Sequence, residues 1–284
     1  MTPQQIWAVV DSFLIETAML FLLTAGFFLT HRTAKIFNIA GPDFATLGAY
    51  LIWSFFALLG WNIWLATAIA IIAVGLFVVL LDRVTYRYLR GATLSLLLCS
   101  IGVSLVFRYG IFMAWGGRLK KLTFNIPNVE ISPDVVVSGS LLLALAFVGI
   151  ILLVMYYLLN HTRLGVTIRA VADSQALAES FGIDTERTLK FVWFLAGASA
   201  TMGGLILILY LPLTYSMGHE WILLVLAVSI LAGEKISFAN LLGATAIIVA
   251  GMELSLFFVP QAYRTGIGFI ILVLVIVIRR LIKR

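Results

Sequence analysis

Long runs of apolar residues without charge dominate this sequence. Residues 62–81 and 135–159 are two such runs, and each is long enough to cross a membrane as a helix. About 20 apolar residues in a helix span the hydrocarbon core of a bilayer. Of the 284 residues, 62% are hydrophobic and 11% are charged, whereas soluble domains are about 45–50% apolar and about 25% charged. The sequence therefore predicts an all-α, polytopic transmembrane helical bundle.

The apolar runs predict about eight or nine spans, of which one or two are broken or re-entrant. The predicted spans are residues 6–29, 44–60, 62–81, 94–115, 135–159, 190–211, 220–233, 238–258 and 265–281. Gly41 and Pro42 interrupt the chain between the first two, because a proline ring blocks helix continuation. The run at 220–233 is short for a span, so a full crossing and a re-entrant segment both remain possible.

Lysine and arginine residues are distributed unequally between the two sides of this predicted bundle. If the N-terminus lies outside, only four of the 19 fall in outer loops, namely Arg118, Lys120, Lys121 and Arg264. Cytoplasmic loops of membrane proteins are enriched in these residues. We therefore expect a multi-pass protein of the cell (cytoplasmic) membrane, with its N-terminus outside and its C-terminus cytoplasmic. Residues 1–284 would form a single transmembrane domain, with an outer loop at 116–134 and a cytoplasmic loop at 162–190.

The cytoplasmic loop at 162–190 is the longest polar, charge-bearing segment. Asp173 or Ser174 can cap the N-terminus of a short helix over the sequence QALAESF. Gly182 follows where a left-handed residue ends helices, and Asp184 can cap the next helix. Leu177 and Phe181 are spaced i and i+4, so they would form one apolar ridge. That ridge could rest on the membrane, the commoner use, or fill a groove in a partner.

The sequence carries no pattern typical of an enzyme or a nucleotide-binding protein. The phosphate-binding pattern GxxxxGK[ST] is absent, and residues 233–237 are only a fragment of it. The three histidines are scattered without metal-ligand spacing. We therefore expect no catalytic residues, no metal and no cofactor. The net charge of +6 is explained by basic cytoplasmic loops, so we expect no nucleic-acid partner.

Three charged residues fall within apolar runs, which costs at least about 2.5–3.5 kcal/mol on insertion scales. Glu16, Arg108 and Glu253 either pair to hold helices together or line a substrate route, and the first alternative is favoured for Glu16 and Arg108. Transporters bind substrates at broken helices near the midplane. That rule predicts a substrate path whose residues are Asn38, Gly41, Pro42 and Asp43, and secondarily Glu253. The competing interpretation is that 38–43 is a cytoplasmic turn.

Four segments, in order along nearly the whole chain, resemble one family of membrane permeases. Residues 162–204 are similar to a loop pattern RA…A…GI…K followed by a span rich in glycine and alanine. Residues 38–50, 87–105 and 251–280 resemble three further motifs of the same family. The family is that of the permease subunits of ABC importers for branched-chain amino acids.

The resemblance implies a permease that moves branched-chain or other small amino acids by alternating access. Its implied partners are cytoplasmic ABC ATPase subunits, a second related permease subunit and an extracytoplasmic solute-binding protein. ATP hydrolysis would then occur in separate subunits. The residues implied to contact the ATPase are Ser174, Ala176, Leu177, Ala178, Phe181, Gly182 and Asp184.

The chain also departs from the family pattern. Gly41, Pro42 and Asp43 stand where the family has His-Gly-Glu, and Glu16 and Arg108 stand where it usually has small or uncharged residues. These differences affect the expected specificity more than the expected class. Two other functions stay open: an ion-coupled secondary transporter that works without an ATPase, and a structural membrane scaffold.

Overall fold

A computed structural model describes residues 3–122, 129–132, 135–233, 235–256, 260, 266–271, 273–274 and 277. Its elements in chain order are α1 (Pro3–Ala34), α2 (Gly41–Trp53), a π-helix η1 (Ser54–Leu58), α3 (Ile63–Val84), a 3-10 helix η2 (Tyr86–Leu89), α4 (Thr93–Trp115), β1 (Val129–Ser132), β2 (Val135–Val137), α5 (Gly139–His161), α6 (Arg163–Asp173), α7 (Gln175–Ser180), α8 (Thr185–Tyr210), a 3-10 helix η3 (His219–Trp221), α9 (Ile222–Leu231) and α10 (Phe238–Ser255).

The protein is a polytopic helical bundle, as the apolar runs predicted. Six described helices are long and apolar enough to cross a membrane: α1 from Val9, α3, α4, α5 from Leu141, α8 and α10. The helix beginning at His219 is shorter. The predicted span 265–281 lies only partly within the described residues.

Three predicted boundaries were wrong in detail. The span placed at 135–159 begins as a helix only at Gly139, because residues 135–137 pair antiparallel with β1. Part of the loop 116–134, which was predicted to lie outside, is thus strand β1 of a hairpin. The span placed at 44–60 begins at Gly41 and passes into the π-helix at Ser54. The run placed at 220–233 contains α9, which ends at Leu231.

Two antiparallel helices, α1 and α8, form the centre of the bundle. In each, 83% of the most apolar window is buried, against 22% for α4. Close approach requires glycine here: a Cβ at Gly26 of α1 would lie 2.5 Å from the Cα of Ala196 of α8. Small residues allow this kind of backbone contact between membrane helices. The glycine- and alanine-rich sequence of α8 therefore serves packing.

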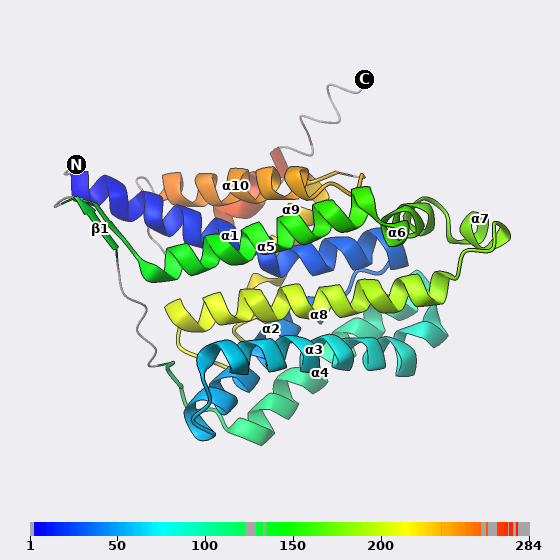
Figure 1. Ribbon diagram of the computed structural model, residues 1–284, viewed down its shortest axis with the longest axis horizontal. Helices are drawn as coiled ribbons and strands as arrows, with labels where there is room; N and C mark the ends of the chain where they lie inside the picture. The colour runs from blue at the N-terminus through cyan, green and yellow to red at the C-terminus, as the bar shows by residue number, and fades with distance from the viewer. Residues whose placement is uncertain are drawn as a thin grey trace.

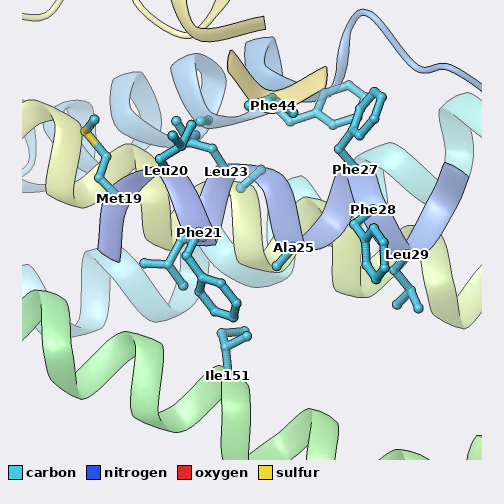
Figure 2. Close-up of a cluster of buried hydrophobic side chains, with 14 of the residues drawn as sticks. Met19, Leu20, Phe21, Leu23, Ala25, Phe27, Phe28, Leu29, Phe44 and Ile151 are labelled. Atoms are coloured by element: carbon cyan, nitrogen blue, oxygen red, sulfur yellow. The ribbon is translucent and has the colours of Figure 1, made fainter. Parts of the chain in front are cut away.

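The rest of the bundle is arranged around this pair. Helix α1 also packs against α5, α9 and α10, while α8 packs against α2 and α3. Figure 2 shows Phe21 of α1 pointing toward Ile151 of α5, and Phe27 lying beside Phe44 of α2. Each central helix is followed by a break and a short helix, α2 or α9.

The two ends of the bundle carry different structures. In Figure 1, β1 and the start of α1 lie at one end, and α6 and α7 lie at the other. The loops 116–134 and 162–190 were predicted to lie on opposite sides of the membrane. Strand β1 of the first and helices α6 and α7 of the second lie at opposite ends of the bundle.

Candidate functional site: a buried junction and a surface elbow

The break between α1 and α2, residues 35–40, is partly buried. Ile36, Asn38 and Ala40 are buried, whereas Lys35 is exposed. The side-chain oxygen of Asn38 accepts a hydrogen bond of 3.0 Å from the hydroxyl of Tyr86. The hydroxyl of Ser100 on α4 accepts a hydrogen bond of 3.3 Å from the N–H of Ile39. Side chains therefore satisfy backbone groups that a helix would otherwise pair.

Helix α2 starts directly after this break. Its first turn contains Pro42 and the carboxylate of Asp43. Asp43 is 0% exposed, and its position in the first turn favours a negative charge. The hydroxyl of Ser104 on α4 donates a hydrogen bond of 2.5 Å to the Oδ2 atom of Asp43. Oδ1 itself is buried and has no hydrogen-bond partner among the described residues.

The second break, between α8 and α9, reaches the same first turn of α2. The backbone N–H of Gly218 donates a hydrogen bond of 2.9 Å to the hydroxyl of Thr46. A Cβ added at Gly218 would lie 2.0 Å from the carbonyl oxygen of Pro42. Only glycine therefore fits at this contact, which joins segments 172 residues apart.

Helix α4 supplies polar side chains along one face to this meeting point. Ser100, Ser104 and Arg108 are spaced i, i+4 and i+8, so they share that face. Arg108 lies one turn beyond Ser104, whose hydroxyl is bonded to Asp43, and His219 directly follows Gly218, whose N–H is bonded to Thr46. Within the described part of the chain, the Nε atom of Arg108 and the Nδ1 atom of His219 are buried without a hydrogen-bond partner.

We call this meeting point the junction. It comprises Asp43, Thr46, Ser104, Arg108, Gly218 and His219. At a rise of 1.5 Å per residue, Ser104 lies about 17 Å along α4 from its start at Thr93. That is about half of a hydrocarbon core roughly 30 Å thick, the depth at which broken helices bind substrates in transporters.

Glu253, the secondary candidate, lies elsewhere. It is buried on α10, and one of its carboxylate oxygens accepts a hydrogen bond of 3.1 Å from the hydroxyl of Ser12. Ser12 belongs to the first part of α1, whereas Asn38 follows the other end of that helix. The structure thus brings Asn38, Gly41, Pro42 and Asp43 together and leaves Glu253 in a separate contact between α1 and α10.

The second candidate region is the elbow, residues 174–184, at the end of the bundle. Ser174 is the N-cap of α7, and its hydroxyl accepts a hydrogen bond of 3.3 Å from the N–H of Leu177. Gly182 has a φ of +78°, and Asp184 accepts a hydrogen bond of 2.9 Å from the N–H of Arg187 at the start of α8. The three local roles predicted for these residues are confirmed, with Ser174 rather than Asp173 as the cap.

The side chains of the elbow do not all face outward. Leu177 is 59% exposed and Phe181 is 79% exposed, so the predicted apolar ridge is open to the surroundings. Ala176, Gly182 and Asp184 are exposed as well. Ala178 is 2% exposed and packs against the chain itself. Of the two alanines in α7, only Ala176 is free to touch a partner.

Two side-chain hydrogen bonds connect α6 and the elbow to the end of α1. The ammonium group of Lys35 donates to the carbonyl oxygen of Ala172 at 2.6 Å. The side-chain amide of Gln175 donates to the carbonyl oxygen of Thr33 at 2.8 Å. Lys35 has a φ of +57°, an unfavourable conformation for a residue with a side chain. The break is therefore bonded to the end of α6, and the elbow is bonded to the last turn of α1.

Comparison with known proteins identifies the class of this bundle. Residues 9–277 match the family described as the branched-chain amino acid transport system / permease component. The chain belongs to this family. No solved structure shows a significant match to it.

Curated relatives of this permease align over most of their length. The probable branched-chain amino acid transport permease protein LivH of Methanocaldococcus jannaschii is 27% identical, over 91% of this chain and 84% of its own. The high-affinity branched-chain amino acid transport system permease protein LivH of Escherichia coli (strain K12) is 22% identical, over 90% and 88%. The BraD permease protein of Pseudomonas aeruginosa is 23% identical, over 81% and 76%.

Sequence reasoning missed several residues of the permease that the structure places at these two regions. They are Lys35, Thr46, Ser104, Gln175, Gly218 and His219. A signal for Ser104 was present, since polar residues spaced by four within the apolar run 94–115 mark one face of a helix. Thr46 and Gly218 carried no such local signal, because their contact depends on how distant segments pack.

Proposed function

We propose that this permease is the membrane-spanning subunit of an ABC importer that moves branched-chain or other small amino acids across the cytoplasmic membrane by alternating access. Family membership supports the substrate class, since the relatives are named as transport permeases for branched-chain amino acids. The chain itself carries no chemical step in this proposal. Its sequence lacks the phosphate-binding pattern of an ATPase, so the motor belongs to other subunits.

The observation that carries this proposal is the exposed ridge of the elbow. Helix α7 lies at the end of the bundle opposite the hairpin strand β1 (Figure 1), and its Leu177 and the following Phe181 are exposed. An apolar ridge on a short helix fits a hydrophobic groove of a partner protein. We propose that the partner is a cytoplasmic ABC ATPase subunit. Ser174, Gly182 and Asp184 hold the ridge in place, and Ala176 and Leu177 share the contact with Phe181.

The proposed assembly has further members. A second related permease subunit would complete the translocation path, and an extracytoplasmic solute-binding protein would deliver the amino acid. In this arrangement the N-terminus and residues 116–134 lie outside, and the loop 162–190 and the C-terminus lie in the cytoplasm, as the charge distribution predicts. Substrate would pass the break at Asn38, Gly41, Pro42 and Asp43, while Glu253 supports the contact between α1 and α10.

The test of this proposal is co-purification. The ATPase subunits should purify with the tagged wild-type permease and should be lost with Phe181→Asp, which places a charge in the proposed groove. Phe181→Leu is the matched control, because it keeps an apolar side chain, and it should retain the ATPase. Since Phe181 is 79% exposed, both variants should fold. Retention of the ATPase by Phe181→Asp would refute the assigned contact.

The competing function is a secondary transporter driven by an ion gradient. The two functions differ in what the isolated chain can do. We expect the permease reconstituted alone in vesicles to show no gradient-driven leucine uptake. Uptake by the chain alone without ATP would overturn the ABC proposal.

A further inference from the structure

The junction combines a buried carboxylate and a half-buried guanidinium with buried polar atoms that lack partners among the described residues. Asp43 is fully buried, and its Oδ1 atom has no hydrogen-bond partner in the described part of the chain. The same is true of the Nε atom of Arg108 and the Nδ1 atom of His219. Leaving a buried polar atom unpaired is costly, and buried polar groups in native proteins are nearly always satisfied. Three such atoms at one meeting point therefore indicate a place where something else binds.

The two charges do not satisfy each other directly. Four ion pairs occur among the described residues, and none joins Asp43 to Arg108. Arg108 follows Ser104 by one turn on the same face of α4, and the hydroxyl of Ser104 is bonded to Asp43. Asp43 and Arg108 thus belong to the same region of the protein without closing into a pair.

The arrangement fits a small ligand that carries both charges. An α-amino acid at neutral pH has an ammonium group and a carboxylate on the same carbon atom. An ammonium group has three donors and a buried carboxylate oxygen is its natural acceptor, whereas a guanidinium offers a planar set of donors to a carboxylate. Ser104 orients Asp43 through its other oxygen, so Oδ1 stays free for the ligand.

We propose that Asp43 and Arg108 bind the zwitterionic head group of an α-amino acid, with the ammonium at Oδ1 of Asp43 and the carboxylate at Arg108. His219 adds a polar contact from the second break. This inference rests on the proposed transport function and adds to it the chemical basis of selection along the path. Recognition of both charges explains why an arginine is kept in an apolar helix despite its insertion cost.

The site has a mechanical consequence because its members come from three different segments. Asp43 belongs to α2, Arg108 to α4 and His219 to η3. A bound head group would connect the first break, the second break and the peripheral helix α4. Separation of these segments during alternating access would split the site and release the amino acid.

The experiment uses the complete transporter in vesicles, with leucine as the probe and the binding protein in saturating amount. Uptake of labelled leucine and ATP hydrolysis are measured together. We expect Asp43→Asn and Arg108→Gln each to lower the ratio of uptake to hydrolysis by roughly tenfold or more, since each removes a charge-assisted hydrogen bond to the ligand. The matched control is Ser229→Ala on α9, which removes a buried hydroxyl that has no hydrogen-bond partner among the described residues and should leave the ratio unchanged.

A second measurement separates binding from a purely structural role. Leucine at millimolar concentration should raise by a few degrees the melting temperature of the permease–ATPase complex purified without the solute-binding protein, because a ligand that binds only the folded state stabilises it. Leucinamide lacks the carboxylate, 4-methylpentanoate lacks the ammonium group, and neither should match leucine. The effect of leucine should disappear in Asp43→Asn.

The outcomes distinguish the site from the proposed function. If the wild-type complex takes up no leucine with ATP, the transport function itself fails. If the wild type transports leucine and both variants keep its ratio of uptake to hydrolysis, only the assigned site fails. The site also fails if the variants lose uptake and hydrolysis in parallel with a lower melting temperature, or if the single-charge analogues stabilise the wild type as well as leucine does.

Discussion

The junction places polar side chains in an apolar interior, whereas the elbow presents apolar side chains at the surface. Asp43 is 0% exposed and has an oxygen without a partner in the described part of the chain, while Phe181, which follows a short helix, is 79% exposed. Each region is thus unfavourable as it stands. Each becomes favourable when something complementary binds: a charged small molecule in the junction, and an apolar groove at the elbow. The comparison shows two ways in which a functional region can be recognised: polar atoms without partners in an apolar interior, and apolar side chains exposed at the surface.

The largest effect should come from crowding the junction. In Gly218→Val, a side chain would enter space that the carbonyl of Pro42 occupies. We expect the free energy of unfolding to fall by about 3 kcal/mol, at the upper end of overpacking effects, and uptake to be lost. Thermal unfolding of the purified complex measures this. Gly102→Ala is the control, since nothing lies within 4 Å of its added Cβ; equal stability of the two variants would contradict the tight contact.

A smaller and local effect is expected at the elbow. Gly182→Ala forces a residue with a side chain to adopt a φ of +78°, which costs roughly 1–2 kcal/mol. Because the elbow is exposed, we expect faster amide hydrogen exchange in α7 and weaker ATPase co-purification, with little change in the melting temperature of the bundle. Gly149→Ala, where a Cβ meets nothing, provides the control. Global destabilisation by Gly182→Ala would show that elbow and bundle are not independent.

The smallest change in stability should come from the contact between the elbow and the last turn of α1. Gln175→Leu removes the hydrogen bond to the carbonyl of Thr33, and a hydrogen bond of this kind contributes about 1 kcal/mol. We expect uptake to fall relative to ATP hydrolysis while the ATPase still co-purifies. Gln175→Glu, which cannot donate from its ionised side chain, should behave like Gln175→Leu. Unchanged coupling in both variants would assign this bond a packing role only.

The sequence predicted those parts that depend on neighbouring residues. Apolar runs identified the long helices, and Ser174, Gly182 and Asp184 were recognised because caps need specific residue types at fixed positions. The break before Pro42 followed from the geometry of proline. Residues 135–137 were misassigned because a run of valines suits a membrane helix and a strand equally well.

The site was predictable only in part. Asp43 was found through its helix break, but its partner Ser104 is 61 residues away and the contact of Thr46 with Gly218 spans 172 residues. Such pairs are set by packing between distant helices, which no local pattern encodes. For the same reason Glu253 was grouped with Asp43, although its partner is Ser12. Ala178 was taken as a surface residue, because a six-residue helix gives little periodicity from which to infer its buried face.

The attachment of the elbow to α1 bears on how force would travel through this protein. Thr33 and Lys35 flank Ala34, the last residue of α1, and both are bonded to the neighbourhood of α7. A push on α7 would therefore act at the pivot between α1 and α2, without bending the 32-residue α1. Only a few residues separate Lys35 from Asn38 and Asp43, so a small displacement of α7 by an attached motor would also displace Asn38 and Asp43.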